Sequence, residues 1–231
     1  MNIQGFNKLT LLDYPGRVAC TVFVGGCDLR CPFCHNSSLV LSPRENTPIS
    51  EEEVLLHLRR RRGILEGITV SGGEPILQGD LVDFLKKIRE TGDYAIKLDT
   101  NGTHPSRLAS IIDAGLVDKV ALDIKNAPER YALTVGIQNF DVTPVSESLS
   151  LLLSSGIDYE LRTTAVRQFH DADAFASIGK FIEGCGDYYI QNFVDSGAVM
   201  RGGLSGFDKD EMESFAEIVR PFVGRVTLRG V

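Results

Sequence analysis

Residues 18–36 read Val-Ala-Cys-Thr-Val-Phe-Val-Gly-Gly-Cys-Asp-Leu-Arg-Cys-Pro-Phe-Cys-His-Asn. The first seven residues form the short apolar run that is typical of a buried strand, and two glycines end it. Cys27, Cys31 and Cys34 then follow at positions i, i+4 and i+7. Thiolates at this spacing can hold three corners of one iron–sulfur cube and leave the fourth iron without a protein ligand. Because catalytic metal sites keep one position open for a reacting molecule, the spacing favours chemistry over a structural role.

A structural zinc site is the main alternative for this loop. Three cysteines beside His35 could bind zinc, but such sites usually combine two separated ligand pairs, and the sequence shows no second pair. Cys20 lies in the apolar run and is expected to be a buried thiol, whereas Cys185 suggests no role. The cysteine count is odd and no signal peptide is evident, so disulfides are not expected and a reducing cytoplasm fits best.

Composition and charge are those of an enzyme rather than of a nucleic-acid or membrane protein. The chain has 231 residues, 43% of them hydrophobic, and a net charge of −7, which argues against binding to nucleic acid or an anionic membrane. No apolar stretch approaches the ~20 residues of a membrane helix. The basic run 59–62 closes a helical pattern and complements its dipole, with docking as the alternative. We expect one domain over residues 1–231, with 196–231 as its C-terminal extension.

Short β-branched runs alternate with longer amphipathic runs, which predicts an α/β fold built on a parallel sheet. The expected strands are 18–24, 67–71, 95–99, 119–124, 159–166, 188–193 and, more weakly, 225–228. The expected helices start at Ser50, with a capping box to Glu53, and run near 80–91, 105–114, 145–155, 171–183 and 208–219. Right-handed strand–helix units of this kind curl into a barrel or an open arc of one.

Unusual residues follow the predicted strands, at the carboxyl ends where active sites of such folds gather. These segments are the cysteine loop, Ser71-Gly-Gly-Glu-Pro75, Asp99-Thr-Asn-Gly102 and Asp123-Ile-Lys125. Arg162 lies on the fifth of these strands, and Gln191-Asn192 near the end of the sixth. The double glycine would let backbone groups approach a ligand amine, although a plain turn is the alternative. Asp99 and Asp123 could hold ribose hydroxyls, an ammonium or a cation, or could cap a helix. Lys125 could meet a ligand carboxylate or simply pair with Asp123. Together these groups suit an amino acid joined to a nucleoside.

The cysteine loop, with Phe33 before its last cysteine and Gly-Gly-Glu-Pro downstream, resembles the radical S-adenosylmethionine (SAM) superfamily. Five further motifs are similar to those of the glycyl-radical activating enzymes, and nearest to the longer type that serves anaerobic ribonucleoside-triphosphate reductase. They are Leu12-Asp-Tyr-Pro-Gly16, Gly26-Cys27, Cys34-His-Asn36, Asp99-Thr-Asn-Gly102 and Asp123-Ile-Lys125. The enzyme that activates pyruvate formate-lyase is a near relative of this type.

The resemblance implies a partial, open TIM-type (β/α)6 barrel of parallel strands. It implies one [4Fe–4S] cluster, held by the three cysteines of the loop, whose open iron is chelated by the amine and carboxylate of SAM. The residues implied as SAM contacts are Phe33 near adenine, Gly72, Gly73, Glu74 and Pro75 at the amine, and Asp99, Thr100, Asp123 and Lys125 at the methionine and ribose ends. Asp13 and Arg162, with His35, would face a glycine loop of the partner enzyme; an ordinary salt bridge is the alternative for Asp13 and Arg162.

The activity implied is reductive cleavage of SAM followed by hydrogen abstraction from a backbone glycine of the partner, anaerobic ribonucleotide reductase or a similar enzyme. Flavodoxin or ferredoxin would be the electron donor. A pyruvate formate-lyase-type activase, a small-molecule enzyme similar to 7-carboxy-7-deazaguanine synthase and a non-catalytic iron–sulfur electron carrier are the alternatives. Tyr14 and Phe193-Val194 depart from the family pattern, and the latter leaves the ribose contacts open. We expect 126–143 and 196–207 to form mobile edges that admit the partner.

Overall fold

A computed structural model describes residues 1–43 and 47–231 and shows eight strands in one sheet, in sequence order. The strands are β1 (Ile3–Thr10), β2 (Ala19–Val24), β3 (Gly67–Gly72), β4 (Ala95–Thr100), β5 (Lys119–Asp123), β6 (Asp158–Ala165), β7 (Asp187–Asn192) and β8 (Arg225–Arg229). β1 pairs with β2 antiparallel, while the pairs β2–β3, β3–β4, β6–β7 and β7–β8 are parallel. The seven predicted strands are confirmed within one or two residues at each end. β1 was not predicted.

Helices connect these strands, as the sequence pattern predicts. They are α1 (Ser37–Leu41), α2 (Glu51–Arg60), α3 (Leu81–Thr91), α4 (Pro105–Asp113), α5 (Tyr131–Val135), α6 (Thr143–Ser155), α7 (Ala172–Phe181) and α8 (Lys209–Val219), with short 3-10 turns η1 (Pro75–Leu77), η2 (Pro128–Arg130) and η3 (Arg220–Phe222). α1 and α5 were not predicted, since five-residue helices are too short to show a period. The capping box at Ser50 is confirmed only in part: its hydroxyl accepts from the Glu53 N–H at 3.1 Å, but the Glu53 carboxylate lies 3.5 Å from Lys8 Nζ.

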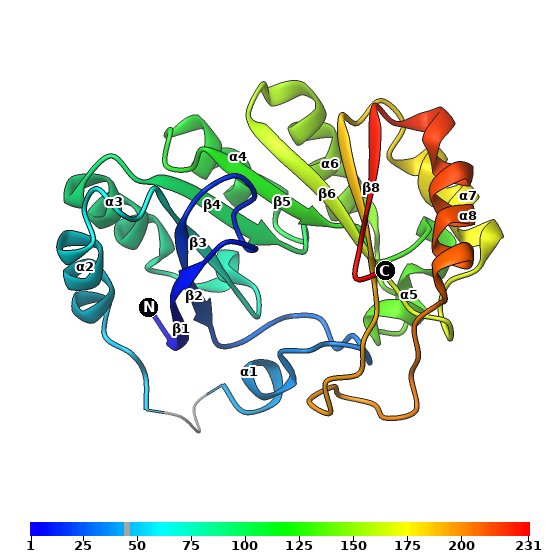
Figure 1. Ribbon diagram of the computed structural model, residues 1–231, viewed down its shortest axis with the longest axis horizontal. Helices are drawn as coiled ribbons and strands as arrows, with labels where there is room; N and C mark the ends of the chain where they lie inside the picture. The colour runs from blue at the N-terminus through cyan, green and yellow to red at the C-terminus, as the bar shows by residue number, and fades with distance from the viewer. Residues whose placement is uncertain (44–46) are drawn as a thin grey trace. The chain divides into compact units, whose positions relative to one another are not determined.

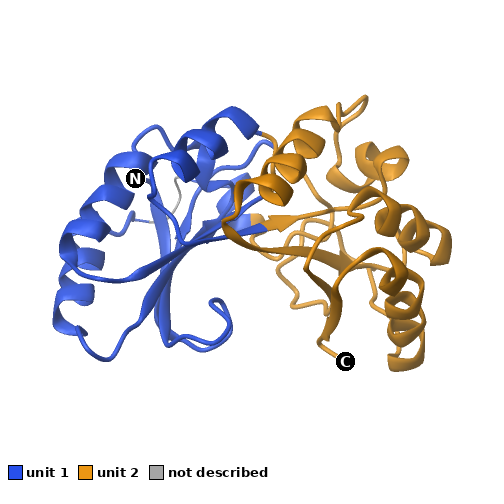
Figure 2. Cartoon of the chain, turned by 90° about the horizontal axis from the view of Figure 1, so that it is seen from above, with its two compact units in different colours: residues 1–28, 38–100, 104–121 blue, residues 29–37, 101–103, 122–231 orange. Residues whose placement is uncertain are grey.

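The chain divides into two compact units, each assembled from three separate segments (Figure 2). Unit 1 comprises residues 1–28, 38–100 and 104–121, and unit 2 comprises 29–37, 101–103 and 122–231. In unit 2, α7 and α8 lie side by side, and α8 also packs against β8 (Figure 1). Residues 196–231 therefore contribute a strand and a helix to unit 2. A single domain over the whole chain stays a prediction.

The strands of unit 1 have one apolar face and one polar face. Cys20, Ile68 and Ile96 are neighbours in register and fully buried, and they form an apolar row. One residue further along each strand, Thr21 faces Thr69 and Thr69 faces Lys97. Because successive side chains alternate between faces, the row of polar residues lies on the opposite side of the sheet. We call this side the polar face.

Candidate functional site

Asp99 lies at the end of β4 on the polar face of unit 1. Lys97 Nζ, fully buried, donates to Asp99 Oδ1 at 2.7 Å, and the Ser71 hydroxyl donates to Oδ2 at 2.9 Å. The side chain does not cap the following helix, since His104 occupies the N-cap of α4. The structure therefore places a charge-compensated carboxylate at the carboxyl end of the strand, where a ligand was predicted.

The turn 72–75 packs directly against the start of the cysteine loop. Gly72 has φ +126°, and a Cβ on Gly73 would lie 1.9 Å from the carbonyl oxygen of Gly26. The Glu74 N–H donates to that same oxygen at 2.8 Å. Only residues without side chains allow this approach. The double glycine therefore has a structural role in addition to the predicted ligand contact: it allows the turn to pack against Gly26, the residue before Cys27.

The buried side chains of Glu74 and Thr100 stabilise the turn through hydrogen bonds. The Glu74 carboxylate is fully buried, and its Oε1 accepts from the Ile76 N–H at 3.1 Å and from the Thr100 hydroxyl at 2.9 Å. A carboxylate that caps η1 and accepts from the neighbouring strand locks the conformation of the turn. The structure gives both residues a positioning role, and contact of either with SAM stays a prediction.

Asp13 also reaches the polar face, from the turn between β1 and β2. The Thr21 hydroxyl donates to Asp13 Oδ2 at 2.6 Å, and the Asp13 N–H donates to the Thr10 hydroxyl at 3.3 Å. Thr21 belongs to the row that includes Lys97. The carboxylate predicted to meet the partner thus lies on the same face as Asp99.

Unit 2 carries a charged group at the end of β5, to which Arg162 contributes from within β6. Asp123 accepts from Lys125 Nζ at 3.0 Å and from Arg162 Nε at 2.8 Å. Burial opposes the charge of Asp123, but the two cations outweigh it and hold the pKa of Asp123 well below its usual range. Burial likewise opposes the charge of Lys125, yet Asp123 and Cys31 raise its pKa above the usual value. All three groups are therefore charged at neutral pH, and the ion pairs considered as alternatives for Lys125 and Arg162 are present.

Cys31 and Cys34 lie beside these charges in unit 2. Burial raises the pKa of Cys31 to about 11, and the Lys125 cation partly counteracts it. Burial also raises the pKa of Cys34, against a hydrogen bond from the backbone of Asn36. Cys27, at the end of unit 1, is half-buried, and all five cysteines are free thiols. Iron binding would displace the thiol protons, and soft thiolate donors in a buried, cation-bearing site suit an iron–sulfur cluster.

Over residues 1–43 and 47–231, no three His, Cys, Asp or Glu side chains are grouped to hold one ion. A cluster bonds each cysteine to a different iron, so the three thiols need not converge on one point.

The rest of the cysteine loop is bound to residues 193–201 in unit 2. The His35 ring stacks on Phe193 with centroids 5.2 Å apart, and His35 Nε2 donates to the Val194 carbonyl at 2.9 Å. The Ser37 hydroxyl donates to the Ala198 carbonyl at 2.6 Å. Phe33 is buried and packs at 5.8 Å from Phe169. The mobility expected for 196–207 stays a prediction, as does the position of Phe33 at adenine.

His170 belongs to the site but was not predicted. Its ring is buried, Nε2 donates to the Lys125 carbonyl at 3.0 Å, and Nδ1 accepts from the Val166 N–H at 3.1 Å. Burial lowers the pKa of His170, so the ring is neutral at pH 7. The contact to Lys125 spans 45 residues of sequence, and no local pattern signals it.

A family model described as the Radical SAM superfamily matches residues 21–174. The chain belongs to the radical SAM superfamily. The match begins in β2 and includes the cysteine loop, the turn 72–75 and the charged group at Asp123. The cofactors of this enzyme are accordingly one [4Fe–4S] cluster and SAM. The residues that hold them stay a prediction.

Three relatives place the similarity among activating enzymes. A Methanocaldococcus jannaschii protein, named as an unproven glycyl-radical enzyme activating enzyme, is 27% identical over 99% of this chain and 96% of its own. The pyruvate formate-lyase 1-activating enzyme of Escherichia coli K12 is 28% identical over 80% of this chain and 76% of its own. The anaerobic ribonucleoside-triphosphate reductase-activating protein of the same strain is 33% identical over 38% of this chain and 58% of its own.

Solved structures support the fold class. Streptococcus suis SuiB bound to its precursor peptide SuiA superposes with a TM-score of 0.71 at 13% identity, over 91% of this chain and 48% of SuiB. This chain thus spans about half the length of SuiB. The likeness confirms the predicted α/β fold of the partial TIM-barrel type. Among the helices of residues 1–43 and 47–231, none is long and apolar enough to cross a membrane.

Proposed function

We propose that this protein is an activase that installs a glycyl radical on a partner enzyme, and that the partner is anaerobic ribonucleoside-triphosphate reductase. The observation that carries the proposal is the contact between Gly73 and Gly26, which seats the predicted amine-binding turn against the residue before Cys27. When bound, the reduced cluster and SAM supply a 5′-deoxyadenosyl radical, with release of methionine, and that radical takes a hydrogen atom from glycine. Flavodoxin or ferredoxin would supply the electron, and the setting would be the cytoplasm.

The chain's own residues bind and orient in this proposal. Cys27, Cys31 and Cys34 hold the cluster, and backbone groups of the turn 72–75 accept from the SAM amine. Asp99 and Asp123 are charged carboxylates at strand ends, as contacts to an ammonium or to ribose hydroxyls require. Lys97 pairs with Asp99, and Lys125 with Arg162 keeps Asp123 ionised.

Contact with the partner's glycine loop is assigned to Asp13 and Arg162. Asp13 lies in the polar face of unit 1, beside Thr21. Arg162 lies in unit 2, with Nε on Asp123 and Nη1 3.9 Å from Glu160 Oε1. An extended peptide offers both amide donors and carbonyl acceptors, so a carboxylate and a guanidinium are suitable partners for its backbone.

The choice of partner rests on similarity of motifs, and a second candidate has its own support. The relative that activates pyruvate formate-lyase matches 80% of this chain, against 38% for the one that activates the reductase. The five motifs taken together are nearest to the reductase type, and Tyr14 stands where the activator of pyruvate formate-lyase has glycine. Pyruvate formate-lyase is therefore the second partner to test.

The test is anaerobic reconstitution with iron and sulfide, reduction, and addition of SAM, with chromatography for 5′-deoxyadenosine. Each candidate partner is then added and examined for a glycyl doublet by electron paramagnetic resonance. We expect 5′-deoxyadenosine from the wild type, none from Cys31→Ala, and a doublet on the reductase. Cleavage of SAM without a doublet on either candidate would reject the activase, and a modified small molecule in place of a doublet would favour a small-molecule enzyme.

A further inference from the structure

Unit 1 exposes a group of large apolar side chains where β1 turns into β2. Leu11 and Leu12, in the turn, are 64% and 83% exposed. Leu9, near the end of β1, and Ile64, after α2, are each more than half exposed. Single exposed leucines are ordinary, but a local group of them marks a contact surface for another molecule.

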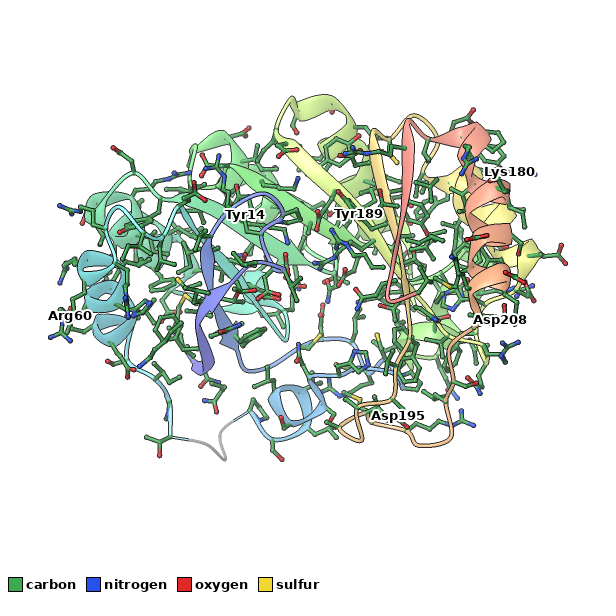
Figure 3. The ribbon with its side chains drawn as sticks, viewed as in Figure 1. Tyr14, Arg60, Lys180, Tyr189, Asp195 and Asp208 are labelled. Atoms are coloured by element: carbon green, nitrogen blue, oxygen red, sulfur yellow. The ribbon has the colours of Figure 1, made fainter. Side chains whose placement is uncertain are left out.

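Basic side chains line a cleft beside two members of this group, Leu9 and Ile64. A cleft of about 450 Å³ lies between β1 and the end of α2, and it is lined by Lys8, Leu9, His57, Arg60, Arg61, Ile64 and Leu65. Arg59 pairs with Glu52 and Arg62 donates to the Thr91 carbonyl. Arg60 and Arg61 have no ion pair within residues 1–43 and 47–231, and Figure 3 shows Arg60 extending outward from α2. These two arginines make this part of the surface positively charged, although the chain as a whole has a net charge of −7.

The same turn also reaches the polar face. Asp13 follows Leu12 directly and accepts from Thr21, whose row includes Lys97. The side chain of Lys97 pairs with that of Asp99. The backbones of these two residues are two positions, or about 7 Å, apart along β4. One end of the turn is therefore part of the predicted reaction site, while its neighbouring leucines face solvent.

We propose that Leu9, Leu11, Leu12, Ile64, Arg60 and Arg61, the leucine–arginine surface, dock the glycyl-radical partner enzyme. The docking segment of that enzyme would be acidic and would carry a large apolar side chain for the cleft. This inference rests on the proposed function, because the partner is the enzyme that presents its glycine beside Asp13. Opposite charges steer such an encounter and the apolar contacts slow its dissociation.

The electron donor is not the occupant of this surface. Ala19 pairs with Thr10 beside the turn, and β2 then runs to Val24 before the cysteine loop begins. Five residue steps of strand cover about 17 Å. A donor must approach the cluster, so it requires a surface near the cysteine loop at the other end of β2.

The test compares variants of the surface with matched controls, with anaerobic ribonucleoside-triphosphate reductase as the partner. The surface variants are Leu11→Ser/Leu12→Ser and Arg60→Glu/Arg61→Glu. Leu153→Ser is the apolar control, since Leu153 is 39% exposed on α6. Lys86→Glu/Lys180→Glu is the charge control, since both lysines are exposed and lie on α3 and α7. Glycyl-radical formation and partner-free 5′-deoxyadenosine formation are measured for each protein, the former also at increasing salt.

We expect each surface variant to form the glycyl radical about tenfold more slowly. Partner-free 5′-deoxyadenosine should stay within about twofold of the wild type in all variants, since none of these residues binds the cofactors. The wild-type rate should fall with salt, and that of the arginine variant should not.

Equal radical formation by surface variants and controls would overturn the docking surface and leave the activase standing. A wild type that cleaves SAM but gives no doublet would reject the activase, and the docking surface with it. A wild-type dimer that dissociates in the leucine variant would assign the surface to a second copy of this chain instead.

Discussion

The predicted site residues of the two units are held by different kinds of interaction. Unit 1 relies on backbone: the turn 72–75 fits against Gly26 because two residues lack side chains, and Glu74 locks it from beneath. Unit 2 relies on charge: Asp123 lies between two cations, and Lys125 acts on the thiol of Cys31. Substitutions in unit 1 should therefore act through shape, and substitutions in unit 2 through charge and protonation.

The largest effect is expected at Gly73, where there is no space for a side chain. Gly73→Ala would put a Cβ 1.9 Å from the Gly26 carbonyl, so the cysteine loop must shift. We expect loss of cluster binding and at least a ~100-fold loss of 5′-deoxyadenosine formation, since displacements of about 1 Å can cost that much. Iron content and chromatography measure these effects. Gly79→Ala is the control, because nothing lies within 4 Å of its added Cβ. Normal cluster content in Gly73→Ala would show that the turn does not depend on shape.

A smaller effect is expected from the charges of unit 2. Asp123→Asn removes the negative charge that lies between Lys125 and Arg162. Because the group is partly exposed, we expect a loss of roughly 1–3 kcal/mol in the free energy of unfolding, or about 3–10 °C in Tm. Thermal unfolding of the reconstituted protein measures it.

The pH dependence of that loss follows from the direction of the shift. The folded pKa of Asp123 is depressed, so its contribution is fully present above the unfolded value, about 4, and disappears only as pH falls through the lower folded value. The difference in Tm between wild type and Asp123→Asn should thus be constant from about pH 5.5 to 8.5. A difference that disappears near pH 6 would mean that Asp123 is not held ionised.

The contribution of His170 changes in the same direction, but its window lies within the working range of pH. Burial lowers its folded pKa, so the stability it contributes is present above the unfolded value, about 6.5, and is lost as pH falls further. The wild type should lose more stability than His170→Asn as pH falls from 7.5 to 5.5. Equal slopes for the two proteins would show that the ring is not held neutral.

The smallest effect is expected at the polar face, where two threonines in one row differ. Thr21 donates to Asp13, whereas the Thr69 hydroxyl has no hydrogen-bond partner in the parts of the chain described, 1–43 and 47–231. Thr21→Val should cost about 1 kcal/mol and slow glycyl-radical formation, while Thr69→Val should be neutral or stabilising. Urea unfolding and the radical assay measure both. Equal costs would show that the bond to Asp13 contributes nothing.

The sequence predicted most of the fold because parallel strands buried on both faces have short apolar runs that are easy to recognise. β1 was not predicted because its apolar residues Ile3, Phe6 and Leu9 recur every third position instead of every second. Register shifts also interrupt its pairing with β2. The site residues at strand ends were predicted because Asp99 and Asp123 directly follow such runs. The stacking of His35 on Phe193 and the bond of His170 to Lys125 join distant segments, so no local pattern could show them.

The central claim is that this radical SAM enzyme acts on a protein glycine. The most direct measurement is electron paramagnetic resonance of anaerobic ribonucleoside-triphosphate reductase after incubation with the reconstituted, reduced enzyme and SAM. The account predicts a glycyl doublet, with 5′-deoxyadenosine formed in step with it, and neither with Cys31→Ala. Formation of 5′-deoxyadenosine with no doublet on the reductase or on pyruvate formate-lyase would contradict it.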